Sequence, residues 1–156
     1  PDLQFCVSHA PNLSDNVYNK FLKNSPFKVI KGENQALLSV SDALMLASGT
    51  VALEACLYQT PMIIAYRGPW LFFLIYLIVR CIKRVSLPNI IADKYIIPEI
   101  LQGDVNVQKI SYEIEKLLFD NEYRAKNIAE LGEVKALLSD KISSKEAAGV
   151  IAEVLS

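Results

Sequence analysis

Short apolar runs alternate with helical patterns along the first half of the chain. Four apolar or β-branched runs have the length of strands: residues 4–8, 28–31, 43–47 and 62–66. Three stretches have helical spacing or the composition of a short helix: residues 14–22, 34–40 and 51–58. Continuous apolar strands that alternate with helices are typical of a parallel sheet whose two faces are covered. The pattern predicts an α/β fold, a Rossmann-like doubly wound parallel sheet, with ligands outside the carboxyl ends of its strands.

The last third of the chain follows a helical period only. Two apolar stripes recur at intervals of three or four residues: Val107, Ile110, Ile114, Leu117 and Leu118, then Ile128, Leu131, Val134 and Leu138. Ser143 and Glu146 resemble a capping box that begins one more helix. We therefore expect a Rossmann-like domain over residues 1–105 and C-terminal helices over residues 106–156, which pack on that domain or on a partner domain.

Length and charge narrow the range of functions. The chain has 156 residues, which predicts one compact domain, and it begins at Pro1 without a signal peptide or an Arg-rich presequence. We expect it to be part of a longer protein. Its net charge of −1 argues against non-specific binding of nucleic acid, which needs a basic surface.

The cysteines and the single histidine do not have the pattern of a metal site. Cys6, Cys56 and Cys81 are widely spaced without a Cys-x-x-Cys motif, so we expect reduced thiols. His9 is the only histidine, and zinc would lack further ligands. We expect no metal. His9 is expected either to have a structural role at the end of a strand or to lie in a loop near a ligand.

The segment from Ser48 to Glu54 has the features of a phosphate and ribose site. A strand ends at residue 47 and a helix begins by Thr50, so the helix N-terminus offers N–H groups and partial positive charge to a phosphate. Gly49 permits close approach of the backbone, and two hydroxyl groups flank it. Glu54 lies four residues after Thr50, on the same helix face, where a carboxylate can accept hydrogen bonds from ribose. An ordinary capped helix with a solvated Glu54 is the alternative.

This segment differs from two common nucleotide motifs. It is neither the Gly-x-Gly-x-x-Gly dinucleotide fingerprint nor a P-loop with its lysine. The residues therefore do not support chemistry on ATP or NAD.

A longer stretch around this turn resembles a known enzyme family. Four blocks carry the resemblance, in the family's order: residues 41–55, 61–67, 85–92 and 98–102. Together they resemble the signature of bacterial lipid-A-disaccharide synthases, and Val-Ser-Leu-Pro-Asn at residues 85–89 is the most specific part. The Ser-Gly-Thr-x-x-x-Glu part is shared with other glycosyltransferases of the two-Rossmann-domain GT-B type. The resemblance implies the C-terminal half of a GT-B fold with a helical tail.

The resemblance also implies a reaction. It is an inverting transfer from UDP-2,3-diacylglucosamine to 2,3-diacylglucosamine 1-phosphate, which gives lipid A disaccharide 1-phosphate and UDP without a cofactor. By resemblance, Ser48, Gly49 and Thr50 hold the diphosphate of the donor, and Glu54 holds its ribose.

Four more residues are candidates by the same resemblance. Asn89 is expected near the donor phosphates or sugar, where it would assist the reaction. Glu99 and Gln102 are further candidates for sugar or phosphate contacts. Arg67 is either a phosphate partner or an exposed or structural arginine.

The chain departs from the family at one point that concerns catalysis. The family's C-terminal half normally opens with a strand and a Gly-Ser-Arg loop, and no Gly-Ser-Arg occurs here. An inverting transfer also needs a carboxylate or a histidine at the acceptor hydroxyl, and these residues offer no convincing base. We expect the base in an N-terminal domain and the fragment alone to be inactive. The alternative hypotheses are another UDP-sugar enzyme of this fold, such as a peptidoglycan glucosaminyltransferase or a UDP-sugar 2-epimerase, and a non-catalytic membrane-associated interaction module.

An apolar segment with a basic end interrupts the second half of the predicted domain. Residues 55–92 contain no Asp or Glu and four basic residues, which is +4 in a chain of −1 and leaves −5 for the rest. Within them, a helix over residues 70–82 would span ~20 Å, which is too short for a hydrocarbon core of ~30 Å. Basic residues behind an aromatic, apolar segment favour an anionic membrane surface. The expected membrane contacts are Trp70, Phe72, Phe73, Arg80, Lys83 and Arg84.

This segment also bears on location and assembly. Acylated substrates make a membrane-facing surface chemically sensible, so we expect a cytoplasmic protein at the periphery of the inner membrane. A buried core helix and a protein interface, such as that of a homodimer, are the alternatives.

Overall fold

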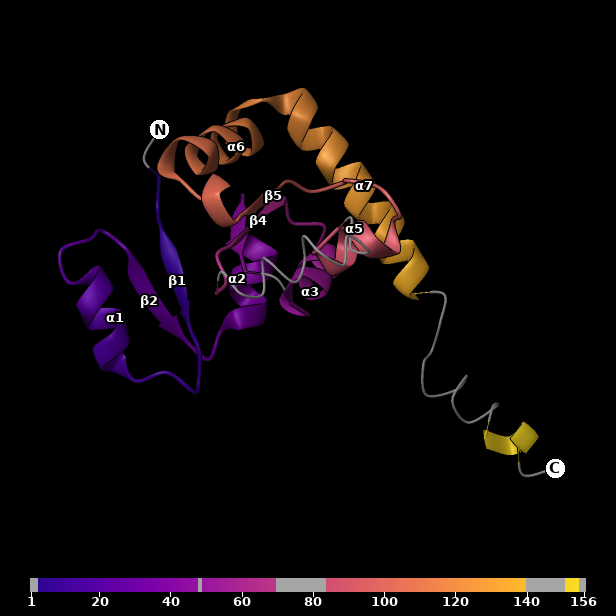
Figure 1. Ribbon diagram of the computed structural model, residues 1–156, viewed down its shortest axis with the longest axis horizontal. Helices are drawn as coiled ribbons and strands as arrows, with labels where there is room; N and C mark the ends of the chain where they lie inside the picture. The colour runs from indigo at the N-terminus through magenta and orange to yellow at the C-terminus, as the bar shows by residue number, and fades with distance from the viewer. Residues whose placement is uncertain (1–2, 48, 70–83, 140–150, 155–156) are drawn as a thin grey trace. The chain divides into compact units, whose positions relative to one another are not determined.

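The computed structural model describes residues 3–47, 49–69, 84–139 and 151–154. The chain divides into two compact units, Pro1–Ser41 and Asp42–Ser156 (Figure 1). The boundary that the sequence predicts between residues 105 and 106 stays a prediction.

The first unit is a small parallel α/β layer. Strands β1 (Cys6–His9) and β2 (Lys28–Lys31) pair in parallel, and helix α1 (Asp15–Leu22) connects them. Helix α2 (Asn34–Val40) follows β2 and contacts β1. Helix α1, which the helical spacing of residues 14–22 predicts, has no buried residue, and its Phe21 is 73% exposed. A two-stranded layer offers too little apolar surface to cover such a helix face.

The second unit contains a three-stranded sheet in the order β3-β4-β5. Its strands are β3 (Leu44–Leu46), β4 (Met62–Tyr66) and β5 (Glu99–Leu101), and both pairings are parallel. Its helical elements are α3 (Val51–Tyr58), α5 (Leu87–Ile91), the 3-10 turn η1 (Gln102–Asp104), α6 (Val107–Phe119) and α7 (Asn121–Ser139). The fold class is therefore that predicted from the sequence, an α/β fold with Rossmann-like parallel strands and a helical tail.

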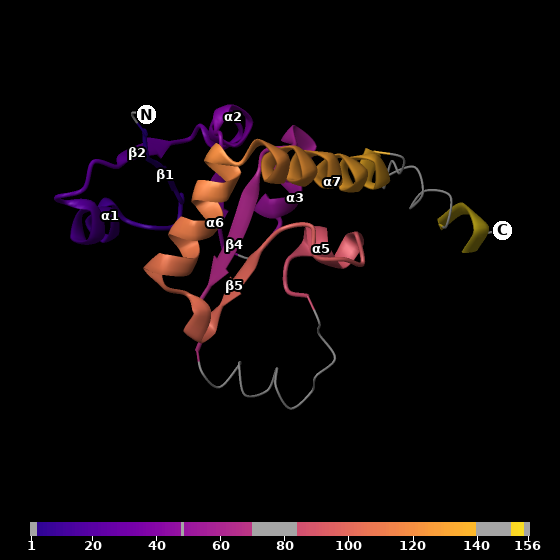
Figure 2. The same cartoon turned by 90° about the horizontal axis from the view of Figure 1, so that it is seen from above.

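The core of the second unit lies around its central strand. Met62, Ile63 and Ile64 of β4 are fully buried because β4 has a strand on either side. Helix α6 packs along β4, and its Leu117 joins a cluster with Ile63 and β5 (Figure 2). Helix α7 packs against α3, where its predicted stripe buries Leu131 and Val134 completely.

Two local predictions differ from the structure, and two elements were not predicted. Residues 43–47 were expected to form a buried strand, but β3 is an edge strand of its sheet, and Met45 is 59% exposed. The α6 stripe was expected to include Val107, which is exposed at the first turn of the helix. Strand β5 and helix α5 were not predicted, because three and five residues are too few to show a period.

Some predicted features lie outside the described residues. They are the start of the last helix at Ser143, and the apolar stretch at residues 70–83 with Trp70, Phe72, Phe73, Arg80 and Lys83. Among the helices that the structure does describe, none combines the length and the hydropathy needed to cross a membrane.

Candidate functional site

The carboxyl edge of the three-stranded sheet brings most of the predicted site residues to one side of the second unit. Leu46 pairs with Ile64, and Tyr66 pairs with Leu101, so the three strands end close together. The segments that follow are the turn into α3, Arg67 after β4, and Gln102 after β5. In open parallel sheets this edge is where ligands bind.

The turn from β3 into α3 has the backbone that an anion site needs. Gly49 has a φ of +148°, a conformation that side chains with a Cβ rarely adopt, and no atom lies within 4 Å of the place that a Cβ would take. Thr50 follows as the residue before the first helical turn. The N–H groups of Ala52 and Leu53 donate to Gly49 O at 3.3 Å and to Thr50 O at 2.9 Å, so an anion at this turn would meet the earlier N–H groups, those of Gly49, Thr50 and Val51. The turn is therefore open and its backbone specifically requires glycine.

Glu54 lies one helical turn beyond Thr50. Its N–H donates to Thr50 O at 3.2 Å, and both side chains are exposed. An exposed carboxylate beside a helix N-terminus can accept hydrogen bonds from a ligand that sits on that terminus. Ser48, the other predicted residue of the turn, lies outside the described residues.

Arg67 and Gln102 complete this edge. Arg67 is exposed directly after β4, where its cation is accessible. Gln102 is half-buried, with a φ of +52°, at the start of η1. Both follow the paired residues Tyr66 and Leu101, so they extend the edge on the side of β5.

Asn89 lies in a different environment, in α5 and fully buried. Its Nδ2 donates to Ile97 O at 2.9 Å and to Glu99 Oε1 at 2.8 Å. Its Oδ1 accepts from Ile96 N at 2.8 Å and from Ile97 N at 3.0 Å. All four hydrogen-bonding positions of the amide are thus occupied within the chain. A direct contact between Asn89 and a ligand would require this network to open.

Glu99 is the second centre of the same network. Its carboxylate accepts from Val85 N at 3.0 Å, Ser86 N at 2.8 Å and Ser86 Oγ at 2.7 Å. Ser86 is the N-cap of α5, so Glu99 caps this helix from a neighbouring strand. The sequence offered Glu99 as a candidate for sugar or phosphate contacts, whereas in this structure its oxygens hold the chain's own donors.

The network extends to α7 through the segment that precedes β5. Asn127 Nδ2 donates to Ile96 O at 2.8 Å, and Ile64 N donates to Pro98 O at 2.9 Å. With the bonds to Asn89, every backbone polar group of residues 96–98 has a partner, as buried backbone requires. Sequence reasoning missed Ser86, although a serine before Leu-Pro is a typical helix start.

Arg84 is engaged within the chain. Its Nη1 lies 2.5 Å from Asp93 Oδ1, its Nη2 donates to Asp93 O, and its guanidinium lies 5.6 Å from the ring centre of Tyr95. Its side chain is about one-fifth exposed. The predicted membrane contact of Arg84 stays a prediction.

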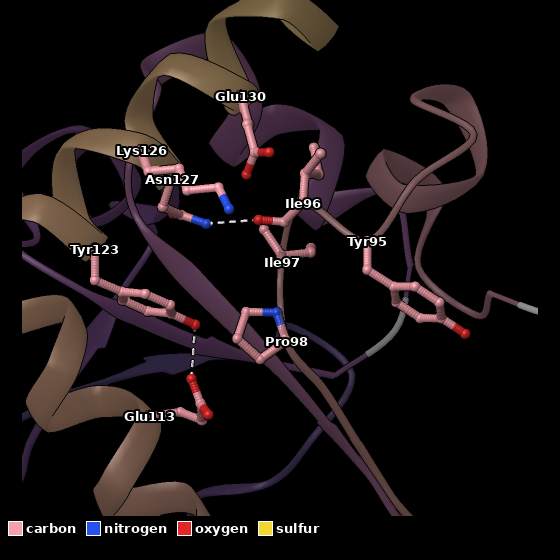
Figure 3. A pocket seen from close by; sticks show the side chains of 9 residues that line it. All are labelled: Tyr95, Ile96, Ile97, Pro98, Glu113, Tyr123, Lys126, Asn127 and Glu130. Atoms are coloured by element: carbon pink, nitrogen blue, oxygen red, sulfur yellow. Dashed lines mark hydrogen bonds between the residues drawn. The ribbon is translucent and has the colours of Figure 1, made fainter.

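A separate hollow of about 270 Å³ lies between residues 95–98 and the helices α6 and α7 (Figure 3). Tyr123 Oη donates to Glu113 Oε2 at 2.7 Å at one side of it. Burial, and then this hydrogen bond, raise the pKa of Tyr123. None of the residues that the sequence predicted for the ligand lines this hollow, so it is distinct from the sheet edge.

His9 has structural partners in the first unit. Its Nε2 lies 2.9 Å from Asp15 Oδ1, and its ring stacks on Tyr18 at 4.5 Å. Lys31 Nζ also donates to Asp15, at 2.7 Å, and this bond and then that of His9 lower the pKa of the Asp15 carboxyl. Within the described ranges, no three His, Cys, Asp or Glu side chains are grouped as metal ligands would be.

Comparison with known proteins matches most of the sequence of this chain to one family. A family model described as lipid-A-disaccharide synthetase matches residues 1–154. The lipid-A-disaccharide synthase of Anaeromyxobacter dehalogenans (strain 2CP-1) is 36% identical over 143 residues, which are 90% of this chain and 37% of that protein. That of Geobacter sulfurreducens is 31% identical over 157 residues, 99% of this chain and 41% of that protein.

The chain thus spans about two-fifths of the length of the curated relatives that it matches. Because the family model covers almost every residue, including the Ser-Gly-Thr turn and the α5–β5 network, the chain belongs to the lipid-A-disaccharide synthetase family.

Proposed function

We propose that the complete protein that carries this chain is an inverting glycosyltransferase and that this chain is its donor-binding half. The reaction joins UDP-2,3-diacylglucosamine to 2,3-diacylglucosamine 1-phosphate, with release of lipid A disaccharide 1-phosphate and UDP. Family membership supports the activity. The observation that carries the donor role is the open turn at Gly49 on the carboxyl edge of a parallel sheet, with Glu54 exposed one turn along α3.

The donor would lie along this edge. Ser48, Gly49 and Thr50 would hold the diphosphate through the helix N-terminus, and Glu54 would accept hydrogen bonds from the ribose. Arg67 and Gln102, at the ends of the two neighbouring strands, would contact phosphate or sugar. Asn89 and Glu99 would support this site without contacting the donor, because their polar atoms are hydrogen-bonded within the chain.

The base of the reaction is proposed to lie elsewhere in the complete protein. A base must reach the acceptor hydroxyl within hydrogen-bond distance. At the described part of this edge, Glu54 is a candidate, but the ribose would occupy it. The guanidinium of Arg67 and the amide of Gln102 are poor bases at neutral pH. The chain alone is therefore expected to give no disaccharide, and detectable synthesis by the chain alone would contradict this part.

The experiment is calorimetry of UDP with the complete protein and its Glu54→Ala variant. Loss of the carboxylate should weaken binding by about 1–3 kcal/mol, the scale for lost hydrogen bonds to a charged group. Glu115→Ala, which removes an exposed glutamate of α6 well outside the sheet edge, is the matched control and should bind UDP unchanged.

Two results would reject the assignment. Unchanged UDP affinity in Glu54→Ala would remove Glu54 from the ribose site. Failure of the unaltered complete protein to bind UDP would reject the donor site as a whole and favour a non-catalytic interaction module.

A further inference from the structure

The hydrogen bonds at Glu99 fit a carboxylate and no other side chain of that size. The donors are Val85 N, Ser86 N, Ser86 Oγ and Asn89 Nδ2, and Oε1 accepts from the last three at 2.8, 2.7 and 2.8 Å. Oε2 accepts from Val85 N at 3.0 Å. A carboxylate only accepts, so both oxygens satisfy these donors. In a glutamine at this position, the NH₂ group would replace one carboxylate oxygen, and its two hydrogens would point at N–H or O–H donors of the chain.

The network is close to the proposed donor site. Glu99 lies opposite Ile64, which lies opposite Leu46, so the three residues form one row across the sheet. At about 4.8 Å between strands, Glu99 is roughly 10 Å from Leu46, which ends the strand before the Ser-Gly-Thr turn. Helix α5 also contacts α3, the helix that carries Glu54. Glu99 thus holds the start of the helix that packs on the donor-site helix.

We propose that Glu99, acting through Ser86 and Asn89, is a positioning residue of the donor site. It fixes the start of α5, and α5 in turn fixes the direction of α3 and of its first turn. Asn89 connects α5 to β5 and to the segment before it, because its single amide bonds both Glu99 and the backbone of residues 96–97. This inference rests on the proposed function, since it assumes that the first turn of α3 binds the donor.

The test is UDP binding by the complete protein and three variants, measured by calorimetry at a temperature well below the Tm of each. Glu99→Gln should weaken UDP binding about tenfold, because an amide does not accept all four hydrogen bonds and the start of α5 would shift. Ser86→Ala, which removes only the Oγ bond of a buried serine, should weaken it by a smaller factor. Ser86→Ala still tests the proposal if Glu99→Gln does not fold.

Glu113→Gln is the matched control for the chemistry of the substitution. Glu113 accepts one hydrogen bond, from Tyr123 Oη at 2.7 Å, and an amide oxygen can accept the same bond. It lies on the seam of α6 and α7, so UDP binding by Glu113→Gln should equal that of the unaltered protein.

The outcomes separate this inference from the function on which it rests. No UDP binding by the unaltered protein would reject the proposed function. If Glu99→Gln and Ser86→Ala both bind UDP as tightly as the unaltered protein and only their Tm is lowered, the network serves only the fold, and the proposal is overturned. Loss of binding in Glu99→Gln without a fall in Tm, with full binding in Ser86→Ala, would overturn it by placing Glu99 on the ligand itself.

Discussion

At the scale of single residues, exposure separates two kinds of polar group in the second unit. Thr50, Glu54 and Arg67 are exposed at the sheet edge, where a ligand can reach them. Asn89 is fully buried, and each polar atom of its amide has a partner in the chain. Burial of a polar group is costly unless it is hydrogen-bonded. The same physical rule makes the first group available to a ligand and commits the second to the fold.

Cys56 gives a prediction at this scale. It is fully buried, and burial raises the pKa of its thiol to about 12. The pKa of the thiol is higher in the folded protein than in the unfolded protein. The stability that comes from burying the neutral thiol is therefore complete at neutral pH and is lost as pH rises from about 9 toward 12. In a Cys6→Ser, Cys81→Ser background, the folded protein should react with a thiol reagent at least ~100-fold more slowly than the unfolded protein, since the thiolate is the nucleophile.

The control is a variant that keeps only Cys6, which is exposed. Its reaction rate should differ little between the folded and the unfolded protein. Equal rates for Cys56 in the two states would show that this thiol is not buried.

At the scale of elements, α7 contacts α3, the helix that carries Glu54, near the C-terminal end of α3. Helix α3 ends at Tyr58, and its C-cap residue Gln59 has a φ of +55° and an N–H that donates to the carbonyls of Ala55 and Cys56. A Cβ added at Gly132 of α7 would lie 2.8 Å from Gln59 Nε2, the far end of a flexible side chain. Gly132 therefore lies beside the end of α3, but no rigid group requires it to be glycine.

Gly132→Ala is accordingly expected to stabilise the protein. Alanine is better than glycine inside a helix by up to ~1 kcal/mol, and the Gln59 amide can turn aside at small cost. The free energy of unfolding, from chemical denaturation, should rise by about 0.5 kcal/mol. Gly32→Ala is the matched control and should lower it by about 1 kcal/mol, because Gly32 has a φ of +78°. A loss of stability in Gly132→Ala would mean that Gln59 is held rigidly.

At the scale of the whole molecule, charge and apolar surface are unevenly distributed along the chain. Residues 55–92 carry +4, whereas the chain as a whole carries −1. We propose that this part of the protein meets an anionic membrane surface, through Trp70, Phe72 and Phe73 together with the basic residues at positions 80, 83 and 84. Such a surface would bring the donor edge, at Arg67, near substrates that carry acyl chains.

Vesicle sedimentation tests this proposal. Phe72→Glu with Phe73→Glu should sharply reduce binding of the complete protein to vesicles that contain anionic lipid, because two charges replace inserted rings. Phe21→Glu with Phe119→Glu is the matched control, since both rings are exposed elsewhere in the chain, and it should bind as before. Equal binding by the two double variants would reject the membrane contact.

The sequence by itself determined the order of most elements and the place of the Ser-Gly-Thr turn between a strand and a helix. The runs at residues 28–31, 34–40, 51–58 and 62–66 became β2, α2, α3 and β4 with the predicted bounds. Turn residues such as Gly32 and Pro61 bound these runs, so local pattern and propensity specify them. The Ser-Gly-Thr turn was recognisable because a glycine, hydroxyls and a glutamate stand at fixed local spacing.

Other features depend on contacts between residues that are far apart in the sequence, and only the tertiary structure decided them. Strand β5 is three residues long, and it is defined by its pairing with β4 rather than by its own composition. Asn89 and Glu99 are ten positions apart, and nothing local reveals that one carboxylate and one amide satisfy each other in a buried network. Whether a polar side chain faces a ligand or the core depends on which distant segments cover it. That is a property of packing, and a linear pattern of residue types does not carry it.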